Sequence, residues 1–204
     1  MAITTEQIKD LRDQTGVSVM QCKKALEEAG GDVAKALIIL RKKSGEIAAK
    51  RGDKTFGAGT VQAYIHATGN VGSMVVLMCE TDFVSGNTEF KTLARDIAMH
   101  ITASNPKFLT KEDITEEARA VAREVFVKEI EDQAKEKQKA MPKEMQAKVL
   151  EGKLATYFGE MVLLDQPFIK NPELTIQTLI NNAVQKFGEK IAIARFTRFN
   201  VLDR

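Results

Sequence analysis

The sequence has almost no net charge, which argues against one large class of partner. Its 30 lysine and arginine side chains nearly balance 28 aspartates and glutamates, and the formal net charge is +2. Such a chain offers no broad positive field to a phosphate backbone, so we expect no direct contact with nucleic acid. With 204 residues, 44% of them hydrophobic, it can bury one sizeable core, or one core and a small satellite domain.

Cysteine and histidine are scarce and well separated. The two cysteines, Cys22 and Cys79, do not form a Cys-x-x-Cys pair, and this usage is typical of a reducing compartment. We expect both thiols to be buried. The two histidines, His66 and His100, fall in different predicted elements and lack partners at metal-ligand spacing. The sequence therefore predicts no metal site and no cofactor.

Long apolar runs are also missing. No segment approaches the roughly 20 apolar residues needed to cross a bilayer. The first residues lack a basic stretch followed by an apolar one, as a secretory signal would have. We expect a cytoplasmic protein without membrane contact.

The beginning of the chain carries the signals of three short helices. Capping-box spacing marks two helix starts, at Thr4 and Ser18, and Gly16 ends the first helix. Apolar positions at helical spacing allow all three helices to share one small core. We expect a partner-docking domain at residues 1–45, followed by a charged, glycine-punctuated linker at residues 46–56.

From residue 59 the pattern changes to a period of two, which predicts strands. Val61, Ala63 and Ile65 alternate with polar residues, and Ser73 to Met78 forms a second, more apolar run, so we expect a hairpin aimed at a core. The apolar stripe from Phe90 to Ile101 is spaced three and four apart. This spacing is typical of a helix that lies on a sheet.

The second half of the chain predicts a helical arm and a last strand. Thr115 to about Lys139 is rich in Glu, Lys and Ala, and a second helix runs from Lys143 towards Leu164, so the arm covers about 115–160. Residues favouring strands from Ile191 to Phe199 predict pairing with the hairpin. The predicted fold class is α+β, with a small antiparallel sheet, packed helices and a long helical hairpin in a core and dimerisation domain at 57–204.

The strongest candidate for a working site follows the second strand. Thr81, Asp82, Phe83 and Val84 close the apolar run that ends at Cys79, and turn-forming residues come next. A strand end is held rigidly, so the side chains just beyond it can be aimed at another molecule. By themselves these four residues are explained more simply by a core aromatic and a turn-forming aspartate. The other motifs of the chain decide between the two interpretations.

Four further segments accompany this motif: residues 11–16 (LRDQTG), 22–26 (CKKAL), 163–168 (LLDQPF) and 195–199 (RFTRF). In order and spacing, the five segments resemble the elongation factor Ts family, from about Ile8 to Val201, and most closely its short bacterial form. The resemblance implies a three-helix bundle of the ubiquitin-associated type at the start of the chain.

The resemblance implies a guanine nucleotide exchange factor for elongation factor Tu that binds and performs no covalent chemistry. It implies that Thr81 to Val84 enter the nucleotide-binding domain of that GTPase. There Phe83 would wedge beside the magnesium site while Asp82 meets polar groups, and the displaced magnesium would leave GDP less tightly held. Thr81 would orient the turn and Val84 would anchor it to the factor's own core.

Further partner contacts follow from the same resemblance. They are Gly16, Val19, Met20, Lys23 and Lys24 in the first helices, and His66 at the hairpin tip. Where the family usually has Gly-Met-Met-Asp, this chain has Ser18, Val19, Met20 and Gln21, which trims one side chain and removes a charge.

The short form of the family carries one core module where longer members carry two. The resemblance therefore implies a homodimer in which a second subunit supplies the missing partner surface. Apolar residues of the sheet and of the helix from Phe90 to Ile101 could form such an interface.

Three functions of other classes compete with exchange. An enzyme would need a cofactor cradle or an activated nucleophile, but Gly57-Ala58-Gly59 lacks the third glycine of a dinucleotide loop and Gly152-Lys153 lacks the earlier glycine of a phosphate-binding loop. Cys79 with His66 is better explained by packing of opposing strands. The three-helix domain alone would suit an adaptor that binds another protein. The Glu- and Lys-rich helices alone would suit a structural arm that holds two copies of the chain together.

Overall fold

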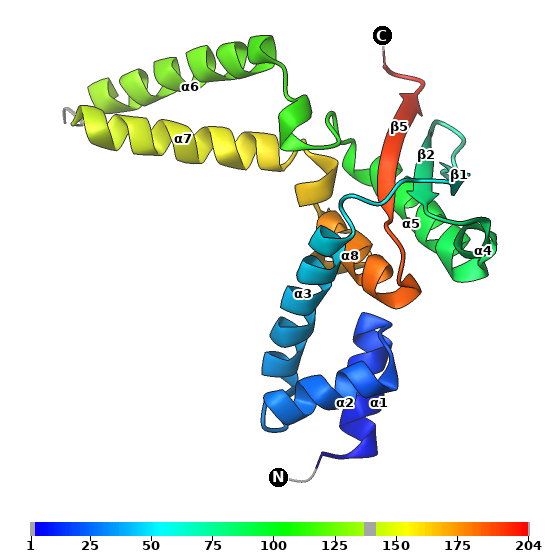
Figure 1. Cartoon of the computed structure of the whole chain (residues 1–204). Coiled ribbons are helices and arrows are strands. Elements are labelled where there is room, and N and C mark those ends of the chain that lie inside the picture. The colour runs from blue at the N-terminus through cyan, green and yellow to red at the C-terminus, as the bar shows by residue number, and fades with distance from the viewer. Residues whose placement is uncertain (1–2, 137–141, 204) are drawn as a thin grey trace. The chain divides into compact units, whose positions relative to one another are not determined.

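The computed structural model of the chain describes residues 3–136 and 142–203. The chain forms two compact units (Figure 1), one made of the chain up to Ser104 and from Pro167 onward, the other of Asn105–Gln166. The first unit contains α1 (Thr5–Thr15), α2 (Val19–Glu28), α3 (Val33–Lys50), β1 (Ala58–Ile65), β2 (Val71–Cys79), α4 (Asp82–Gly86), α5 (Thr88–Ser104), β3 (Pro167–Phe168), β4 (Asn171–Thr175), α8 (Ile176–Phe187) and β5 (Ala192–Asn200). The second unit contains the 3-10 helices η1 (Lys111–Asp113) and η2 (Leu163–Asp165), and the helices α6 (Glu116–Glu136) and α7 (Lys143–Gly159). Helices around a small antiparallel sheet confirm the predicted α+β class.

The first two helices begin and end where their capping residues predict. The hydroxyl of Thr4 accepts a hydrogen bond from the backbone N–H of Gln7, at 3.2 Å, and Ser18 does the same for Gln21, at 3.3 Å. Gly16 ends α1 with φ of 69°, a left-handed conformation that glycine adopts without strain. The three helices enclose one small buried core, made of Leu11, Val17, Cys22, Ala25, Leu26, Ala36 and Leu40.

Helix α3 continues past residue 45 and ends only at Lys50. A glycine inside a helix lowers the stability of the helix by about 1 kcal/mol relative to alanine, and this cost favours a helix that ends near Gly45. Packing outweighs that cost here, because α3 lies along α8. Gly45 is part of this contact, since a Cβ at its position would lie 3.9 Å from the side chain of Asn181 on α8. The helix therefore runs on to the turn that precedes β1.

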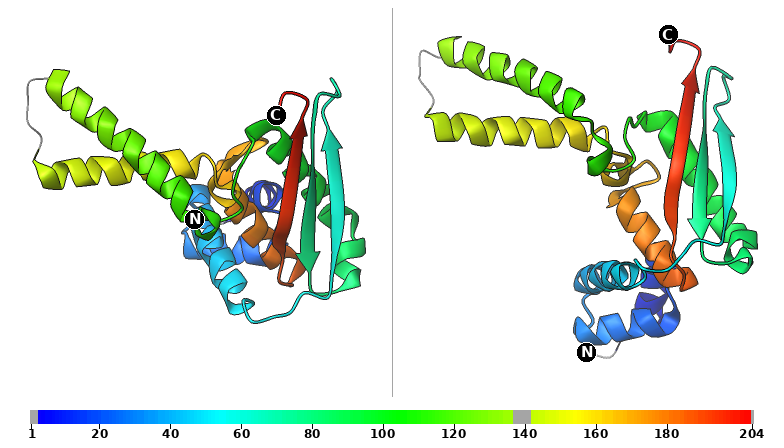
Figure 2. Two further views of the ribbon diagram at one scale, coloured as in Figure 1. Left: turned by 90° about the horizontal axis from the view of Figure 1, so that it is seen from above. Right: turned by 45° about the horizontal axis from the view of Figure 1, so that its top comes forward.

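The sheet has the strand order β1-β2-β5, and all its pairs are antiparallel. Helix α5 runs along one face of this sheet, as the two views of Figure 2 show. The face of β2 that turns towards α5 is buried and carries Ser73, Val75, Leu77 and Cys79. The Ser73 hydroxyl donates to the carbonyl of Ala98 on α5 at 2.6 Å, so the polar member of this face is also satisfied.

The expectation that Val61, Ala63 and Ile65 point into a core is wrong. All three are exposed, and the residues between them take the half-buried positions. The pairing register explains the reversal, because it sets Val61 opposite Val76 and Ala63 opposite Met74, both on the face of β2 away from the core. The apolar side of β1 therefore faces outward in a single copy of the chain.

The apolar stripe of α5 is buried against the sheet, as its spacing predicts, apart from Leu93, which is half-buried. Five of its residues have no exposed surface: Phe90, Ala94, Ile97, Ala98 and Ile101. The expectation that this helix supplies an interface between two copies is wrong, because the stripe is already used inside the chain.

Charged side chains join the strand ends to the turn after α3. The carboxylate of Glu80 accepts a hydrogen bond from Arg51, at 2.8 Å, and another from the backbone N–H of Lys190. The ammonium group of Lys190 donates to the carbonyls of Gly52 and Lys54 and lies 4.6 Å from the centre of the Phe56 ring. The hydrogen bond from Lys190, followed by that from Arg51, lowers the pKa of Glu80.

The second unit is built around the predicted helical hairpin, α6 and α7. A small core of Ile114, Ala122, Phe158 and Val162 lies at its base. Further along, the rings of Phe126 and Tyr157 pack edge-to-face with their centres 5.4 Å apart. The Nζ atom of Lys153 lies 2.7 Å from Oε1 of Glu129. Residues 137–139, the predicted end of the first helix, lie outside the described part of the chain.

Replacing Gly59 by alanine should destabilise the protein by about 1–3 kcal/mol, the usual cost of overpacking. A Cβ at this position would lie 2.6 Å from the carbonyl oxygen of Leu77 on the paired strand. Urea unfolding would measure the loss. Gly86→Ala is the matched control because its Cβ would meet nothing within 4 Å. Equal losses in the two variants would contradict the close approach of β1 and β2.

Replacing Glu80 by glutamine should destabilise the protein at neutral pH but hardly at all in acid. A lowered folded-state pKa means that the carboxylate stabilises the fold fully above the unfolded pKa of about 4.3. That stabilisation is lost as the pH falls through the lowered folded-state pKa. Urea unfolding of both proteins between pH 7 and about pH 3 would test this. A deficit that stays constant over this range would contradict the assignment.

Candidate functional site

The candidate segment after β2 forms a short helix. The sequence predicted an exposed connection here, but Asp82 to Gly86 wind into α4, and the backbone N–H of Ser85 donates to the carbonyl of Thr81 at 3.2 Å. The acidic side chain of Asp82 in the first turn also favours the helix, because its charge complements the helix dipole.

The helix turns two neighbouring apolar side chains in opposite directions. Phe83 is 84% exposed, whereas Val84 is only 3% exposed and packs into the core. Asp82 is exposed beside Phe83. Among the large apolar side chains of the described residues, Phe83 is the most exposed, so its ring is available for contact with another molecule.

The base of α4 is held by a side chain from the other end of the sequence. One carboxylate oxygen of Glu189 accepts from the backbone N–H groups of Glu80, at 3.1 Å, and Thr81, at 3.0 Å. The other oxygen accepts from the Thr81 hydroxyl. The thiol of Cys79 donates to the carbonyl of Thr81 at 3.1 Å. Sequence analysis gave Glu189 no role, and its only local signal was an acid directly after the glycine that ends α8.

The two cysteines are not poised for nucleophilic chemistry. Burial raises the pKa of Cys79, and the negative charge of Glu189 raises it further. Burial also raises the pKa of Cys22. His66 is not a base for Cys79, because Cys79 pairs with Ala58 at one end of the hairpin while His66 follows β1 at the other end. The expectation that these two side chains pack on opposing strands is therefore wrong.

The other predicted contact residues lie at two separate places. Around the turn between α1 and α2, Val19 is 51% and Met20 is 81% exposed, and Lys23 and Lys24 are exposed on the same helix. Gly16 is half-buried in this turn. His66 is exposed at the hairpin tip, where its Nδ1 lies 3.4 Å from the Tyr64 hydroxyl. The hairpin separates His66 from α4, because the two occupy its opposite ends.

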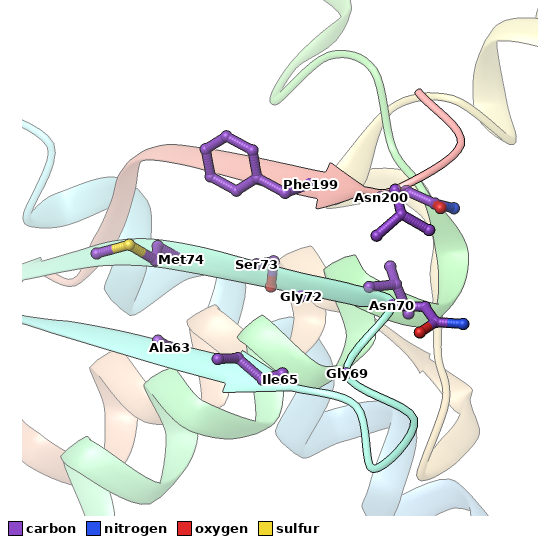
Figure 3. A pocket seen from close by; sticks show the side chains of 11 residues that line it. Ala63, Ile65, Gly69, Asn70, Gly72, Ser73, Met74, Phe199 and Asn200 are labelled. Atoms are coloured by element: carbon purple, nitrogen blue, oxygen red, sulfur yellow. The ribbon is translucent and has the colours of Figure 1, made fainter. Parts of the chain in front are cut away.

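A further exposed surface lies on the side of the sheet that α5 does not cover. We call it the open sheet face and define it by Val61, Ile65, Met74 and Phe199, which are between 45% and 70% exposed. Figure 3 shows Ile65, Met74 and Phe199 on three neighbouring strands. These three side chains help to line a shallow hollow of about 400 Å³. Its exposed apolar side chains make this face a candidate site of contact with another macromolecule.

Within the described residues, no group of three or more histidine, cysteine, aspartate or glutamate side chains is arranged to hold a metal ion. Among the helices of those residues, none is both long and apolar enough to span a membrane.

Comparison with known proteins identifies the family. The family model described as Elongation factor TS matches residues 2–203. The chain is similar to elongation factor Ts of Thermodesulfovibrio yellowstonii, with 46% identity over 201 residues that cover 98% of this chain and 97% of that protein. It is similar to elongation factor Ts of Koribacter versatilis, with 45% identity over 203 residues that cover 100% of this chain and 90% of the relative. These findings confirm the resemblance carried by the separated motifs. The chain belongs to the elongation factor Ts family of translation elongation factors.

Proposed function

We propose that this protein is a guanine nucleotide exchange factor for elongation factor Tu, acting in the cytoplasm by binding and without covalent chemistry. Family membership supports this proposal, and the observation that carries it is Phe83, an aromatic side chain 84% exposed on a helix whose base is fixed. An adaptor that used only the three-helix domain would leave this arrangement without a purpose.

Exchange of this kind is differential binding. A factor that binds the nucleotide-free GTPase more tightly than the GDP-bound form must weaken GDP binding by the same factor, because the two equilibria are linked. Typical couplings of this kind are about 1–3 kcal/mol, and stronger ones weaken GDP binding more. The factor therefore needs a contact that fits the GTPase only when GDP is loosened.

In this proposal Phe83 supplies that contact. It enters the nucleotide-binding domain of the GTPase beside the magnesium site, and Asp82 meets polar groups there. An aromatic ring suits the task because it brings a large rigid area at a low cost in conformational entropy. Displacing the GTPase's magnesium leaves phosphate charge uncompensated, so GDP is held less tightly.

The three-helix domain, residues 1–45, docks on the same GTPase in this proposal. Its contact surface is the turn at Gly16 with Val19 and Met20, together with Lys23 and Lys24. A flexible methionine that is 81% exposed provides apolar area that adapts to a partner. His66 makes a further contact from the hairpin tip, so that the core domain, residues 57–204, engages the partner at more than one point.

The open sheet face is covered by a second copy of the chain in this proposal. Strand alternation directs Val61, Ile65, Met74 and Phe199 to this face, and an antiparallel sheet with apolar residues on both faces needs a cover on each. Two copies related by a two-fold axis would bring the same apolar surface of each chain together. The residues that α5 buries are not available for this contact.

Truncation of Phe83 should abolish most of the exchange activity. We expect the parent protein to accelerate GDP release from elongation factor Tu, and Phe83→Ala to lower the saturating release rate by on the order of tenfold or more. Stopped-flow release of fluorescent GDP would measure both. Val125→Ala, which trims another exposed apolar side chain on α6, should keep the parent rate. No acceleration by the parent would refute exchange, and full activity of Phe83→Ala would refute the role of the ring.

A charge on the open sheet face should break the dimer. We expect the parent protein to sediment as a dimer at micromolar concentrations and Ile65→Lys to sediment as a monomer, because two buried lysines would lose their water without gaining partners. Val121→Lys, at a position on α6 with 65% exposure, is the matched control and should remain dimeric. A monomeric parent would refute the dimer, and a dimeric Ile65→Lys would refute this interface.

A further inference from the structure

The half-buried carboxylate of Glu189 joins two distant parts of the chain. It lies 108 residues from Thr81 in the sequence, yet it accepts three hydrogen bonds from Glu80 and Thr81, all at the junction of β2 and α4. Two of the donors are backbone N–H groups and the third is the Thr81 hydroxyl. A half-buried carboxylate with several such donors holds them in one geometry, because hydrogen bonds to a charged acceptor are stronger than neutral ones and are directional.

This position is where the sheet stops providing backbone hydrogen bonds. The pairing of β2 with β5 ends at Met78 opposite Ala192, after an irregularity between Val76 and Leu77. The N–H groups of Glu80 and Thr81 lie beyond that end. The carboxylate of Glu189 accepts the hydrogen bonds from these two N–H groups, which a neighbouring strand would otherwise accept. The backbone is therefore held in place up to Thr81, the residue just before α4.

The side chain of Thr81 bonds to Glu189 and does not cap α4. It is the N-cap residue of α4, with extended backbone angles, but its side chain accepts no capping hydrogen bond from the helix. Its hydroxyl donates to Glu189 instead. The bond therefore ties the start of α4 to the connection between α8 and β5.

Hydrogen bonds run in both directions between the end of β2 and the connection that leads into β5. The carboxylate of Glu80 accepts from the backbone N–H of Lys190, while the carboxylate of Glu189 accepts from the backbone N–H of Glu80. Arg51 holds the Glu80 carboxylate, and Lys190 reaches the carbonyls of the turn after α3. The start of α4 is thus fixed to the connection that leads into β5 and to that turn.

We propose that Glu189 is a positioning residue for nucleotide exchange, acting through Thr81 to fix the orientation in which α4 presents Phe83. This inference rests on the proposed function. A ring displaces groups in a partner only if its own support does not yield, because otherwise the helix turns and the partner stays closed. Glu189 does not itself touch the GTPase. Its contribution is the rigidity of the base from which Phe83 projects.

The rate of GDP release, measured as a function of the concentration of this protein, distinguishes a positioning residue from one that contacts the GTPase. Glu189→Gln keeps the size of the side chain but removes the charge and one acceptor oxygen, and Thr81→Val removes only the hydroxyl donor. Each should lower the saturating rate of GDP release by about tenfold while changing the half-saturating concentration by less than about twofold. The double variant should be little slower than Glu189→Gln, because both changes break the same bond. Thr81→Ser keeps the hydroxyl and should restore the parent rate.

Amide hydrogen exchange on the free protein tests the hydrogen bonds of Glu189 without any activity. The amides of Glu80 and Thr81 should exchange faster in Glu189→Gln than in the parent, because their acceptor is weakened. Glu124→Gln is the matched control for both measurements, since it removes an exposed carboxylate paired with Lys128 on α6. It should leave amide exchange at Glu80 and Thr81 and the release rate unchanged.

The outcomes distinguish this inference from the proposed function. No acceleration of GDP release by the parent would refute the proposed function, and the role of Glu189 would fall with it. If the parent is active, a parent-like saturating rate in Glu189→Gln would overturn the positioning role alone. A change confined to the half-saturating concentration would also overturn it, in favour of a direct contact. If Glu189→Gln fails to fold, Thr81→Val and Thr81→Ser decide the same question.

Discussion

The burial of one face of strand β2 under α5 is the constraint on which the rest of the structure depends. Side chains alternate along a strand, so Val75, Leu77 and Cys79 reach the core together in only one register. A shift of one residue would expose all three. This register also decides where β2 ends, and therefore where the chain leaves the sheet and α4 begins.

The two surfaces that we assign to partners follow from that register. Beyond Cys79, one helical turn is enough to anchor Val84 and leave Phe83 outside. On the opposite face of the sheet, the same alternation directs Met74 and its neighbours on β1 and β5 outward. A single core thus leaves, among the described residues, an exposed aromatic side chain at its edge and an exposed apolar face. The proposed exchange activity depends on the first surface and the proposed dimer on the second.

Local sequence signals predicted where the helices begin and which face of α5 is buried. Features that depend on contacts between distant residues could not be predicted from the sequence. Capping boxes at Thr4 and Ser18 act within four residues, so their helix starts were readable from the sequence. The spacing of α5 likewise identified its buried stripe. The outward side of β1 was not readable, because alternation gives two faces and only pairing with β2 decides which is buried. The role of Glu189 depends on a contact across 108 residues, which no local pattern encodes.

The most direct test of the account is an equilibrium measurement of reciprocity. The affinity of elongation factor Tu for GDP should be measured with and without a saturating amount of this protein, and the affinity of this protein for elongation factor Tu with and without GDP. Linkage predicts that both affinities fall by the same factor when the other ligand is present. A GDP affinity that does not change at saturation would contradict the claim that this protein works by differential binding.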